Sequence, residues 1–372
     1  MRIVLIGNYA PDGQESMLRY AQMTREGLEQ AQHEVTLATP RPVLNRRHAP
    51  RGMWKWIGYA DKYWLGTREI SRAIRNADVV HVCDHSNAVY VPRRPALPYV
   101  VTCHDLLAVR GALGEDTDCP ASPAGRQLQR AILDGLRRSH AVACVSQATL
   151  RDALRLLGDY PGRLSVIPNA LNYPYQRLEA RELASRLATL PVPGAHRYVL
   201  HVGHNHRRKN RETALRALAT ISGSWDGCMV FAGQPLSAEL RERAVELGVA
   251  ARVVEVAKPS NRLLEGLYNG ALALVYPSRF EGFGWPIIEA QACGCAVICS
   301  DREPLPEVAG EGAIICGADD AHAFGRAILE LGQNEPRRDA LVQRGFENAA
   351  RYNRAVMIGQ LTSLYQQVAG HA

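Results

Sequence analysis

Two carboxylates lie near each other in the sequence, on either side of a glycine-rich turn. Glu281 and Glu289 belong to the segment YPSRFEGFGWPIIEAQACGCAVICSD, and Gly282 and Gly284 lie between them. Carboxylates repel phosphate but accept hydrogen bonds from hydroxyl groups, whereas the free N–H groups at the start of a helix attract phosphate. The pattern therefore favours a ligand that has both phosphates and sugar rings. The alternative is a solvated loop glutamate followed by a helix with an acidic first turn.

The neighbouring residues predict a strand, a turn and a short helix around these carboxylates. LALVYPS is typical of a buried strand, and the two glycines permit backbone conformations that a side chain would block. Pro286 suits the first position of a helix, and Gly294 suits its end. We therefore expect PIIEAQAC to form a helix whose amino end lies close to the ligand.

Three further groups of polar residues follow predicted strands. Arg208 and Lys209 lie in HVGHNHRRKN, where Lys209 is one of only four lysines among 44 cationic residues. His104 and Asp105 end PYVVTCHD, and His81 and His85 lie in VVHVCDHSN. A solvated basic loop and a structural histidine are the alternatives. His204 and His206 show no metal-ligand spacing, and we expect no metal site.

The elements that position these residues alternate between short apolar runs and longer stretches of helical periodicity. This alternation predicts parallel sheets. The predicted strands are RIVLIG, HEVTLAT, DVVHVCD, PYVVTCHD, HAVACVS and LSVIPN in the first half, and RYVLHVG, GCMVFAG, ARVVEVA, LALVYPS, CAVICS and GAIIC in the second. The fold class is therefore α/β, with two Rossmann-like, doubly wound domains. Open parallel sheets bind ligands beyond the carboxyl ends of their strands, so we expect the site in a cleft between the domains.

The predicted boundaries follow from the segment between the two strand series. It has no strand of its own and contains prolines near both ends. We therefore predict a first domain at residues 1–172, a connection at 173–196 and a second domain at 197–354.

Composition indicates a cytoplasmic protein with an anionic partner. The 372 residues include nine cysteines, an odd number that lies mostly in apolar runs and indicates reduced, buried thiols. The segment MRIVLIGNYAPDG is too short an apolar run and lacks the flanks of a signal peptide, and no stretch reaches about 18 apolar residues, so we expect a cytoplasmic location. The formal charge of +7 is compatible with nucleic acid, a phosphate-bearing substrate or an acidic membrane. No nucleic-acid-binding motif accompanies it, so nucleic acid is not expected.

The segment EGFGWPIIE resembles the signature of the retaining, nucleotide-sugar-dependent glycosyltransferases of the GT-B fold, group 1 or family 4 type. PSRFEGFG, EAQACGCAVICSD and PLPEVAG are also similar to that family, and a weaker resemblance extends over nearly the whole chain. It implies two Rossmann-like domains facing across a cleft, a first domain that binds the acceptor and is completed by the helix at 355–372, and a second domain that binds the donor.

The resemblance also implies roles for individual residues. Arg208 and Lys209 would stabilise the diphosphate without a metal or other cofactor, His104 would orient the sugar and the acceptor, and Glu281 would lie near the donor sugar. Other residues implied in donor binding are Gly203, Lys258, Gly282, Phe283, Gly284 and Glu289, of which Glu289 would hold the ribose hydroxyls. His81 and His85 are weaker candidates for the acceptor pocket.

The first turn departs from the family pattern. Relatives have a Gly-Gly pair that approaches the diphosphate, whereas NYAPDGQESM has the single Gly13, followed by Gln14. We keep both as donor-binding candidates. The turn also lacks the G-x-G-x-x-G spacing of dinucleotide-binding dehydrogenases, which argues against that class.

Residues 41–64 combine arginines with five aromatic residues. Such a segment suits an anionic membrane surface, an acceptor-binding flap or a packed helix.

The resemblance therefore implies a retaining glycosyltransferase. It would move a sugar from a UDP- or GDP-sugar to a hydroxyl of a glycan or lipid-linked acceptor in cell-surface polysaccharide synthesis, in the cytoplasm or at the inner face of the membrane. A sugar-nucleotide epimerase of the same fold and a non-catalytic nucleotide-sugar-binding protein are the alternatives.

Overall fold

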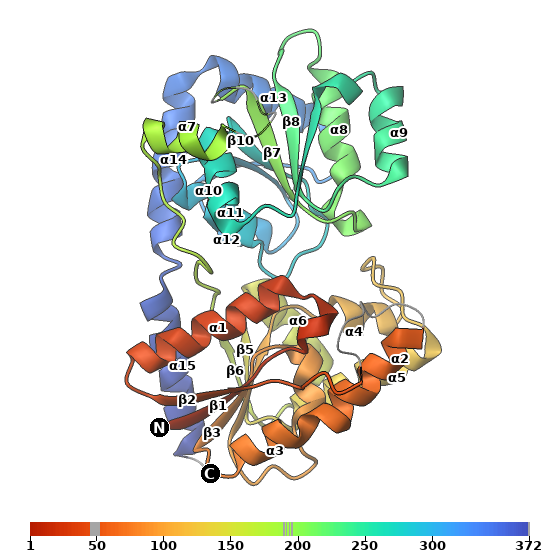
Figure 1. Cartoon of the computed structure of the whole chain (residues 1–372), viewed down its shortest axis with the longest axis vertical. Helices are drawn as coiled ribbons and strands as arrows, with labels where there is room; N and C mark the ends of the chain where they lie inside the picture. Colours follow the sequence, from red (N-terminus) through yellow and green to blue (C-terminus); the bar gives the residue numbers. More distant parts are fainter. Residues whose placement is uncertain (45–52, 189, 191, 193, 195, 371–372) are drawn as a thin grey trace. The chain divides into compact units, whose positions relative to one another are not determined.

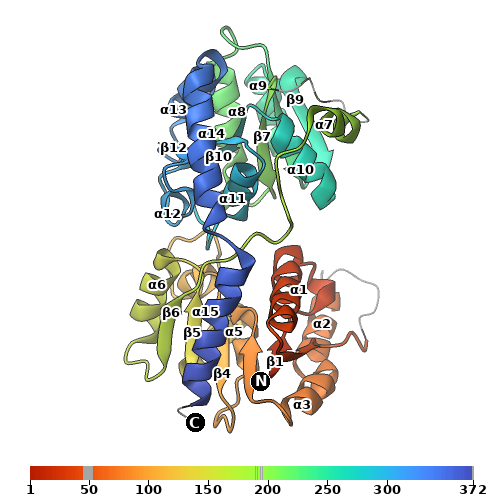
Figure 2. The same cartoon turned by 90° about the vertical axis from the view of Figure 1, so that its left-hand side faces the viewer.

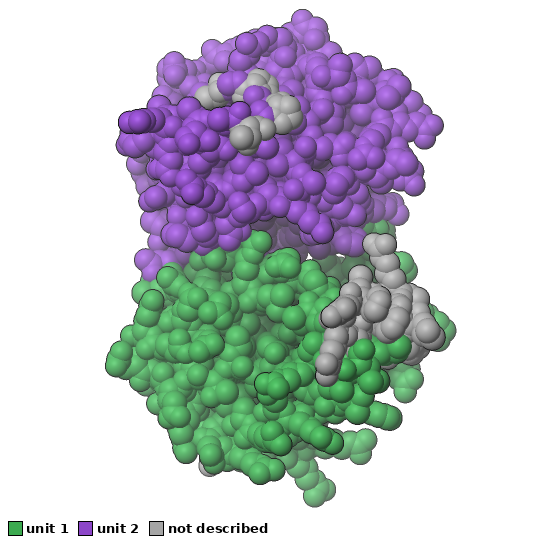
Figure 3. Space-filling model, in the orientation of Figure 1, with its two compact units in different colours: residues 1–172, 354–372 green, residues 173–353 purple. Residues whose placement is uncertain are grey.

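The computed structural model describes residues 1–44, 53–188, 190, 192, 194 and 196–370. These residues form two compact units, one of residues 1–172 with 354–372 and the other of residues 173–353 (Figure 3). Residues 173–196, which the sequence suggested as a connection, belong to the second unit and include a helix, α7 (Ala180–Leu187).

The first unit contains, in its described part, a six-stranded parallel sheet in the order β2-β1-β3-β4-β5-β6 (Figures 1 and 2). Its strands are β1 (Arg2–Ile6), β2 (Glu34–Ala38), β3 (Val79–Val82), β4 (Tyr99–Cys103), β5 (Ala141–Cys144) and β6 (Arg163–Val166). Its helices are α1 (Glu15–Gln30), α2 (Met53–Tyr63), α3 (Arg68–Ile74), α4 (Leu107–Ala112), α5 (Pro123–Arg138), α6 (Gln147–Leu157) and α15 (Arg354–Ala369).

The second unit repeats this architecture, with a six-stranded parallel sheet among its described residues in the order β12-β11-β10-β7-β8-β9. Its strands are β7 (Tyr198–Gly203), β8 (Cys228–Gly233), β9 (Val253–Ala257), β10 (Ala273–Tyr276), β11 (Ala296–Ser300) and β12 (Ala313–Cys316). Besides α7, its helices are α8 (Arg211–Thr220), α9 (Ala238–Glu246), α10 (Asn261–Gly270), α11 (Trp285–Ala292), α12 (Leu305–Ala309), α13 (Ala321–Gln333) and α14 (Glu335–Ala350). The two predicted doubly wound sheets are thus confirmed.

Each sheet has an apolar core because its strands are covered by helices on both faces. Central strands such as β3, β4 and β11 are buried along their whole length. Parallel strands in this setting read as continuous apolar runs rather than as alternating ones. That is why runs such as AVICS were recognisable in the sequence.

The strand order fixes where each sheet can hold a ligand. In the first sheet β1 lies between β2 and β3, and in the second β7 lies between β8 and β10. The chain therefore reverses its direction of travel across the sheet at β1/β3 and at β7/β10. The helices on either side of such a switch point lie on opposite faces, so their connecting turns leave room for a ligand at the carboxyl ends of the strands.

Helix α15 comes from the end of the chain but lies beside α1 in the first unit (Figures 1 and 2). Gly27 makes the close approach, since a Cβ atom there would lie 2.5 Å from Cγ1 of Ile358. The hydroxyl of Tyr365 also forms a hydrogen bond with Nδ1 of His81, and the two atoms lie 2.7 Å apart. The last helix is therefore an integral part of the first unit.

Candidate functional site

The turn after β10 leads directly into α11. Gly284 is the N-cap of α11 with a φ of 102°, a left-handed conformation that favours glycine. A Cβ atom at this position would also lie 2.7 Å from Cδ2 of Leu305. The helix begins at Trp285 and ends at Ala292, so Pro286 occupies its second position rather than the first that the sequence suggested. The shift arises because the backbone of Gly284 already turns the chain into the helix.

Arg208, Lys209 and Glu281 come together at the β7/β10 switch point. Lys209 Nζ lies 2.6 Å from Oε1 of Glu281, and Arg208 Nη1 lies 3.1 Å from Oε2 of the same carboxylate. Arg208 also donates to the carbonyl oxygen of Phe280 over 3.1 Å. The Glu281 side chain is only 8% exposed, whereas that of Arg208 is 27% exposed. Two cations thus meet one buried carboxylate, and Arg208 is the one that solvent reaches most.

Tyr276, the last residue of β10, completes this group. Its hydroxyl accepts a hydrogen bond from Lys209 Nζ over 2.8 Å and donates to Oε1 of Glu281 over 2.7 Å. Burial and the neighbouring carboxylate raise the pKa of Tyr276 well above its usual value, so the hydroxyl stays protonated. Tyr276 therefore fixes both the ammonium and the carboxylate.

The charges in this group shift each other's pKa values. Burial raises the pKa of Glu281, but Lys209 and then Arg208 outweigh it and lower the pKa to about 2. Burial lowers the pKa of Lys209, an effect that Arg208 and Arg211 strengthen and that Glu281 opposes. Glu281 is therefore ionised at neutral pH, and it offsets part of the positive charge that would meet a phosphate.

Glu289 lies on α11 in a different environment. It is 4% exposed, and its Oε2 accepts a hydrogen bond from the hydroxyl of Tyr268 on α10 over 2.8 Å. The partner of Glu289 in this bond is neutral, in contrast to the cations around Glu281. The two carboxylates of the motif therefore have different hydrogen-bond donors, which include two cations at Glu281 and a tyrosine hydroxyl at Glu289.

The remaining donor-binding candidates of the second unit surround these groups. Gly203 ends β7 with a φ of 153°, and its carbonyl oxygen accepts from Gln234 N over 3.1 Å. Lys258 is exposed, and its backbone N–H donates to the carbonyl oxygen of Gly233 over 2.8 Å.

Phe283 is buried with its ring centroid 5.5 Å from that of Tyr352, and Gly282 precedes it in the turn. The Phe283 side chain is thus part of the packing, which leaves its backbone for the predicted role.

The first unit has its own polar cluster at the β1/β3 switch point. Asn8 Nδ2 donates to Asp84 Oδ2 over 2.6 Å and also to Oε1 of Gln14. Burial raises the pKa of Asp84, but His85 and His104 outweigh it, and the net pKa falls to about 2. Gly13 precedes Gln14 with a φ of 65°, and a Cβ atom there would meet nothing within 4 Å. The single glycine thus forms a left-handed turn at the start of α1.

His104 lies immediately after β4 and belongs to the same cluster. It is 6% exposed, its Nε2 lies 3.0 Å from the carbonyl oxygen of Cys83, and its ring packs edge-on against Tyr20 at 4.7 Å. Burial lowers the pKa of His104, and Asp84 opposes this effect. A buried imidazole of this kind is neutral near pH 7.

His81 does not belong to this cluster, which corrects its weaker candidacy for an acceptor pocket. It lies within β3, where Nε2 is 2.7 Å from Thr102 Oγ1 and Nδ1 is 2.7 Å from the hydroxyl of Tyr365. Burial lowers its pKa to about 3. Both ring nitrogens are thus used inside the unit, and His81 is a structural residue.

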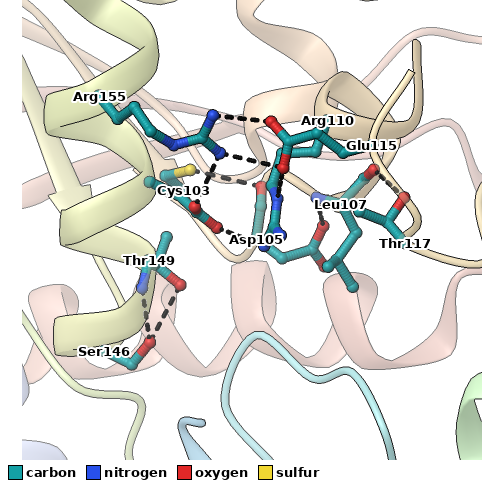
Figure 4. A network of polar contacts seen from close by, with 10 residues as sticks. Cys103, Asp105, Leu107, Arg110, Glu115, Thr117, Ser146, Thr149 and Arg155 are labelled. Carbon is teal, nitrogen blue, oxygen red and sulfur yellow. Dashed lines mark hydrogen bonds and ion pairs between the residues drawn. The ribbon is translucent and has the colours of Figure 1, made fainter. Parts of the chain in front are cut away.

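A network of ion pairs near Asp105 joins charged residues of α4, of the segment after α4 and of α6 (Figure 4). Glu115 accepts from Arg110 Nε and from Arg155 Nη1, each over 2.7 Å, and Asp152 accepts from Arg110 Nη1 over 3.0 Å. The Oδ1 atom of Asp105 accepts a hydrogen bond from the backbone N–H of Leu107, the first residue of α4, over 3.1 Å. Helices α4 and α6 are thereby joined next to the end of β4.

Sequence reasoning did not single out Tyr276, Tyr268, Asn8 or Asp84. Tyr276 and Asp84 lie at or just after strand ends, and this position is the signal that would have found them. Tyr268 carries no comparable signal, because it lies in the interior of a helix.

The described residues also bear on a metal site and on a membrane span. No group of three or more His, Cys, Asp or Glu residues among them is arranged to hold a metal ion. None of the helices described is long and apolar enough to cross a membrane.

The aromatic segment at 41–64 is described only in part. Residues 45–52 lie outside the described residues, as do the side chains of Trp54 and Trp56. Farther along, Trp64 is 82% exposed, whereas Asp61 is buried and accepts from the backbone of Val43 and Leu44, each over 3.0 Å. A membrane role for this segment stays a prediction.

In a comparison with known proteins, two family models match successive parts of the chain. The model described as glycosyl transferases group 1 matches residues 188–348, and the model described as glycosyltransferase family 4 matches residues 17–173.

Two curated relatives are similar over a large part of the chain. The O-antigen chain mannosyltransferase B of Escherichia coli is 27% identical over 255 residues, which is 61% of each protein. The D-inositol 3-phosphate glycosyltransferase of Corynebacterium glutamicum is 27% identical over 282 residues, 72% of this chain and 66% of that protein. The chain thus spans less than two thirds of the length of either relative.

Two solved structures share the whole fold. Sucrose-phosphate synthase from Thermosynechococcus elongatus has a TM-score of 0.77 at 22% identity and covers 100% of both chains. The Anabaena protein HepE in complex with UDP and glucose has a TM-score of 0.71 at 17% identity and covers 98% of both chains. Together with the twin parallel sheets and the EGFGWPIIE motif, these matches show that the chain belongs to the group 1 glycosyltransferases of the GT-B fold.

Proposed function

We propose that this protein transfers a sugar from a nucleoside diphosphate sugar to an acceptor hydroxyl with retention of the anomeric configuration. The observation that carries this proposal is the group of Arg208, Lys209 and Glu281 at the β7/β10 switch point. Two cations at the carboxyl end of a parallel sheet suit a diphosphate, because they oppose the charge that develops when it leaves. The complex of the similar HepE protein with UDP and glucose supports a donor of this class.

The proposed reaction uses the leaving phosphate oxygen as the base. The acceptor hydroxyl attacks the anomeric carbon on the face that the diphosphate leaves, and its proton passes to the departing oxygen. Arg208 and Lys209 stabilise the resulting charge in place of a metal ion, so each is expected to matter by a few kcal/mol. Glu289 holds the ribose hydroxyls, and His104 orients the sugar and the acceptor.

The proposed acceptor is a hydroxyl of a glycan or of a lipid-linked precursor. The relative named O-antigen chain mannosyltransferase B supports a role in the synthesis of a cell-surface polysaccharide. We place the protein in the cytoplasm, with an anionic membrane surface as a partner of residues 41–64. UDP- and GDP-sugars are both candidate donors.

A thermal-shift panel with UDP, GDP, ADP and their sugar conjugates tests the donor site. A ligand at about a hundredfold above its Kd stabilises a protein by about 2.7 kcal/mol. We expect one nucleotide class to stabilise the wild type, Lys209→Ala to lose most of this effect, and Arg207→Ala to keep it. Arg207 is the matched control because it is exposed in the same turn. Equal shifts in the two variants would overturn the placement of the diphosphate.

Proton NMR of the reaction product tests the chemistry. The coupling constant of the anomeric proton distinguishes retention from inversion, and an inverted product would overturn the mechanism. Conversion of the donor without any acceptor would identify an epimerase instead. Binding that leaves the donor intact with every acceptor tried would identify a nucleotide-sugar-binding protein.

A further inference from the structure

Tyr268 is a buried tyrosine whose hydroxyl meets one of the two motif carboxylates. It lies on α10, has no exposed surface, and donates to Oε2 of Glu289 on α11 over 2.8 Å. The two residues are separated by 21 positions in the sequence, so this contact depends on how α10 packs against α11. A buried carboxylate rarely lacks such a donor, because its desolvation is costly.

The bond fixes Glu289 without neutralising it. Burial, and then the carboxylate of Glu289, raise the pKa of Tyr268 well above its usual value, so the hydroxyl keeps its proton at any working pH. Glu281 shows the opposite arrangement, since Lys209 and Arg208 compensate its charge. A neutral hydroxyl donor adds no positive charge, so this bond orients the carboxylate of Glu289 without compensating its charge.

The ring of Tyr268 is itself held in place by aromatic contacts. It packs edge-on against Tyr175 with ring centroids 5.8 Å apart, and Tyr175 packs against Tyr173 at 5.0 Å. Tyr175 is 5% exposed. Such contacts restrict the ring to one orientation, and the hydroxyl therefore points at Glu289 from a fixed position.

We propose that Tyr268 is a positioning residue that sets recognition of the donor's ribose hydroxyls by holding the carboxylate of Glu289. The proposal rests on the proposed function, in which Glu289 binds these hydroxyls. It makes Tyr268 responsible for discrimination between ribonucleotides and deoxyribonucleotides rather than for overall affinity.

Calorimetric titration of the full chain with UDP and GDP, and with their 2′-deoxy and 3′-deoxy counterparts, tests this proposal. For whichever nucleotide the wild type binds, we expect a clear preference for the ribonucleotide. Tyr268→Phe removes only the hydroxyl and should lower that preference by about fivefold, the factor that corresponds to about 1 kcal/mol for one hydrogen bond. In a background of Glu289→Ala, adding Tyr268→Phe should lower it no further.

Tyr198→Phe is the matched control. The hydroxyl of Tyr198 is equally buried and donates to the carbonyl oxygen of Leu267 over 2.7 Å, so it also anchors α10, but it does not bond to Glu289. We expect this variant to keep the wild-type preference. An equal loss of preference in Tyr198→Phe and Tyr268→Phe would show a general effect on α10 and overturn the proposal.

The variants of Glu289 and Tyr268 distinguish failure of the proposed function from failure of the positioning role. If Glu289→Ala keeps the wild-type preference for the ribonucleotide, the role of Glu289 in the proposed function is wrong, and the role of Tyr268 is wrong with it. If Glu289→Ala abolishes the preference while Tyr268→Phe preserves it, the proposed function stands and only the positioning role is overturned.

Should Tyr268→Phe prove too unstable to titrate, Glu289→Gln offers a second measurement. Its side-chain amide keeps an oxygen that can accept from Tyr268, and a preference closer to wild type than that of Glu289→Ala supports the proposal, whereas the same loss in both overturns it.

Discussion

Glu281 shows at the scale of one residue how burial and charge compete. Burial alone would favour the protonated acid, yet Lys209 and Arg208 keep it ionised with a pKa of about 2. The carboxylate thus holds the two proposed phosphate-binding side chains in place before any ligand arrives. Such preorganisation is useful for catalysis, because the charges need little rearrangement when the reaction occurs.

This competition predicts how stability depends on pH. The folded state lowers the pKa of Glu281 from 4.5 to about 2, so its contribution is complete above about pH 4.5 and is lost as the pH falls toward 2. Glu281→Gln should lower the free energy of unfolding by about 2–4 kcal/mol at pH 7, because it leaves Lys209 without its carboxylate. The decrease should be smaller at pH 3, where the wild type has already lost part of the contribution of Glu281. Urea denaturation at pH 3, 4, 5 and 7 measures this.

Glu246→Gln is the control for that experiment, because its side chain is 55% exposed and pairs with Arg243 on the surface. Exposed pairs contribute little, so this variant should follow the wild type at every pH. A constant difference between Glu281→Gln and the wild type from pH 3 to pH 7 would contradict the predicted linkage.

At the scale of the element, α11 depends on the glycine that starts it. Gly284 combines a φ of 102° with close contact to Leu305, so alanine there meets both backbone strain and a clash. We expect Gly284→Ala to destabilise the protein by about 1–3 kcal/mol. The variant should also weaken nucleotide binding, since the first N–H groups of α11 would shift. Urea denaturation and the thermal-shift panel measure the two effects.

Gly359→Ala provides the contrasting change. Gly359 lies exposed inside α15, and a Cβ atom there would meet nothing within 4 Å. Alanine in a helix interior is better than glycine by about 0.5–1 kcal/mol, so this variant should be more stable than the wild type. Similar stability of the two alanine variants would contradict the role assigned to Gly284.

At the scale of the whole molecule, the end of the chain completes the first unit. Helix α15 buries Met357, Ile358, Leu361, Leu364, Tyr365 and Val368. Each such side chain contributes about 1.5–3 kcal/mol when it is fully buried. The first unit therefore depends on residues that are made after the whole second unit.

A chain that ends at Asn353 should consequently lose much of the stability of its first unit. Hydrogen exchange should rise in β3 and α1, which lose the contacts of Tyr365 and Ile358, and in β1, which pairs with β3. It should stay near the wild-type level in β7, β8 and β10. Mass spectrometry of peptides from each strand measures this. A chain that ends at Gly370 is the control, and unchanged exchange in β1 and β3 of the shorter chain would contradict the prediction.

The sequence by itself determined the secondary structure and most of the candidate site. Buried parallel strands are continuous apolar runs, and glycines and prolines mark their turns, so all of this information is local. The same reasoning placed Arg208, Lys209 and Glu281 at strand ends. It missed the start of α11 by one residue, because the left-handed conformation of Gly284 was not visible in the residue types.

Only the tertiary structure decided which side chains meet. Lys209 and Glu281 are 72 residues apart, and Asn8 and Asp84 are 76 apart, so each contact depends on the order of the strands in its sheet. Tyr268 meets Glu289 only because α10 packs next to α11, and His81 proved structural only because α15 returns to the first unit. Local sequence patterns indicate which residue types follow each strand, but the packing of distant segments determines which of these residues contact each other.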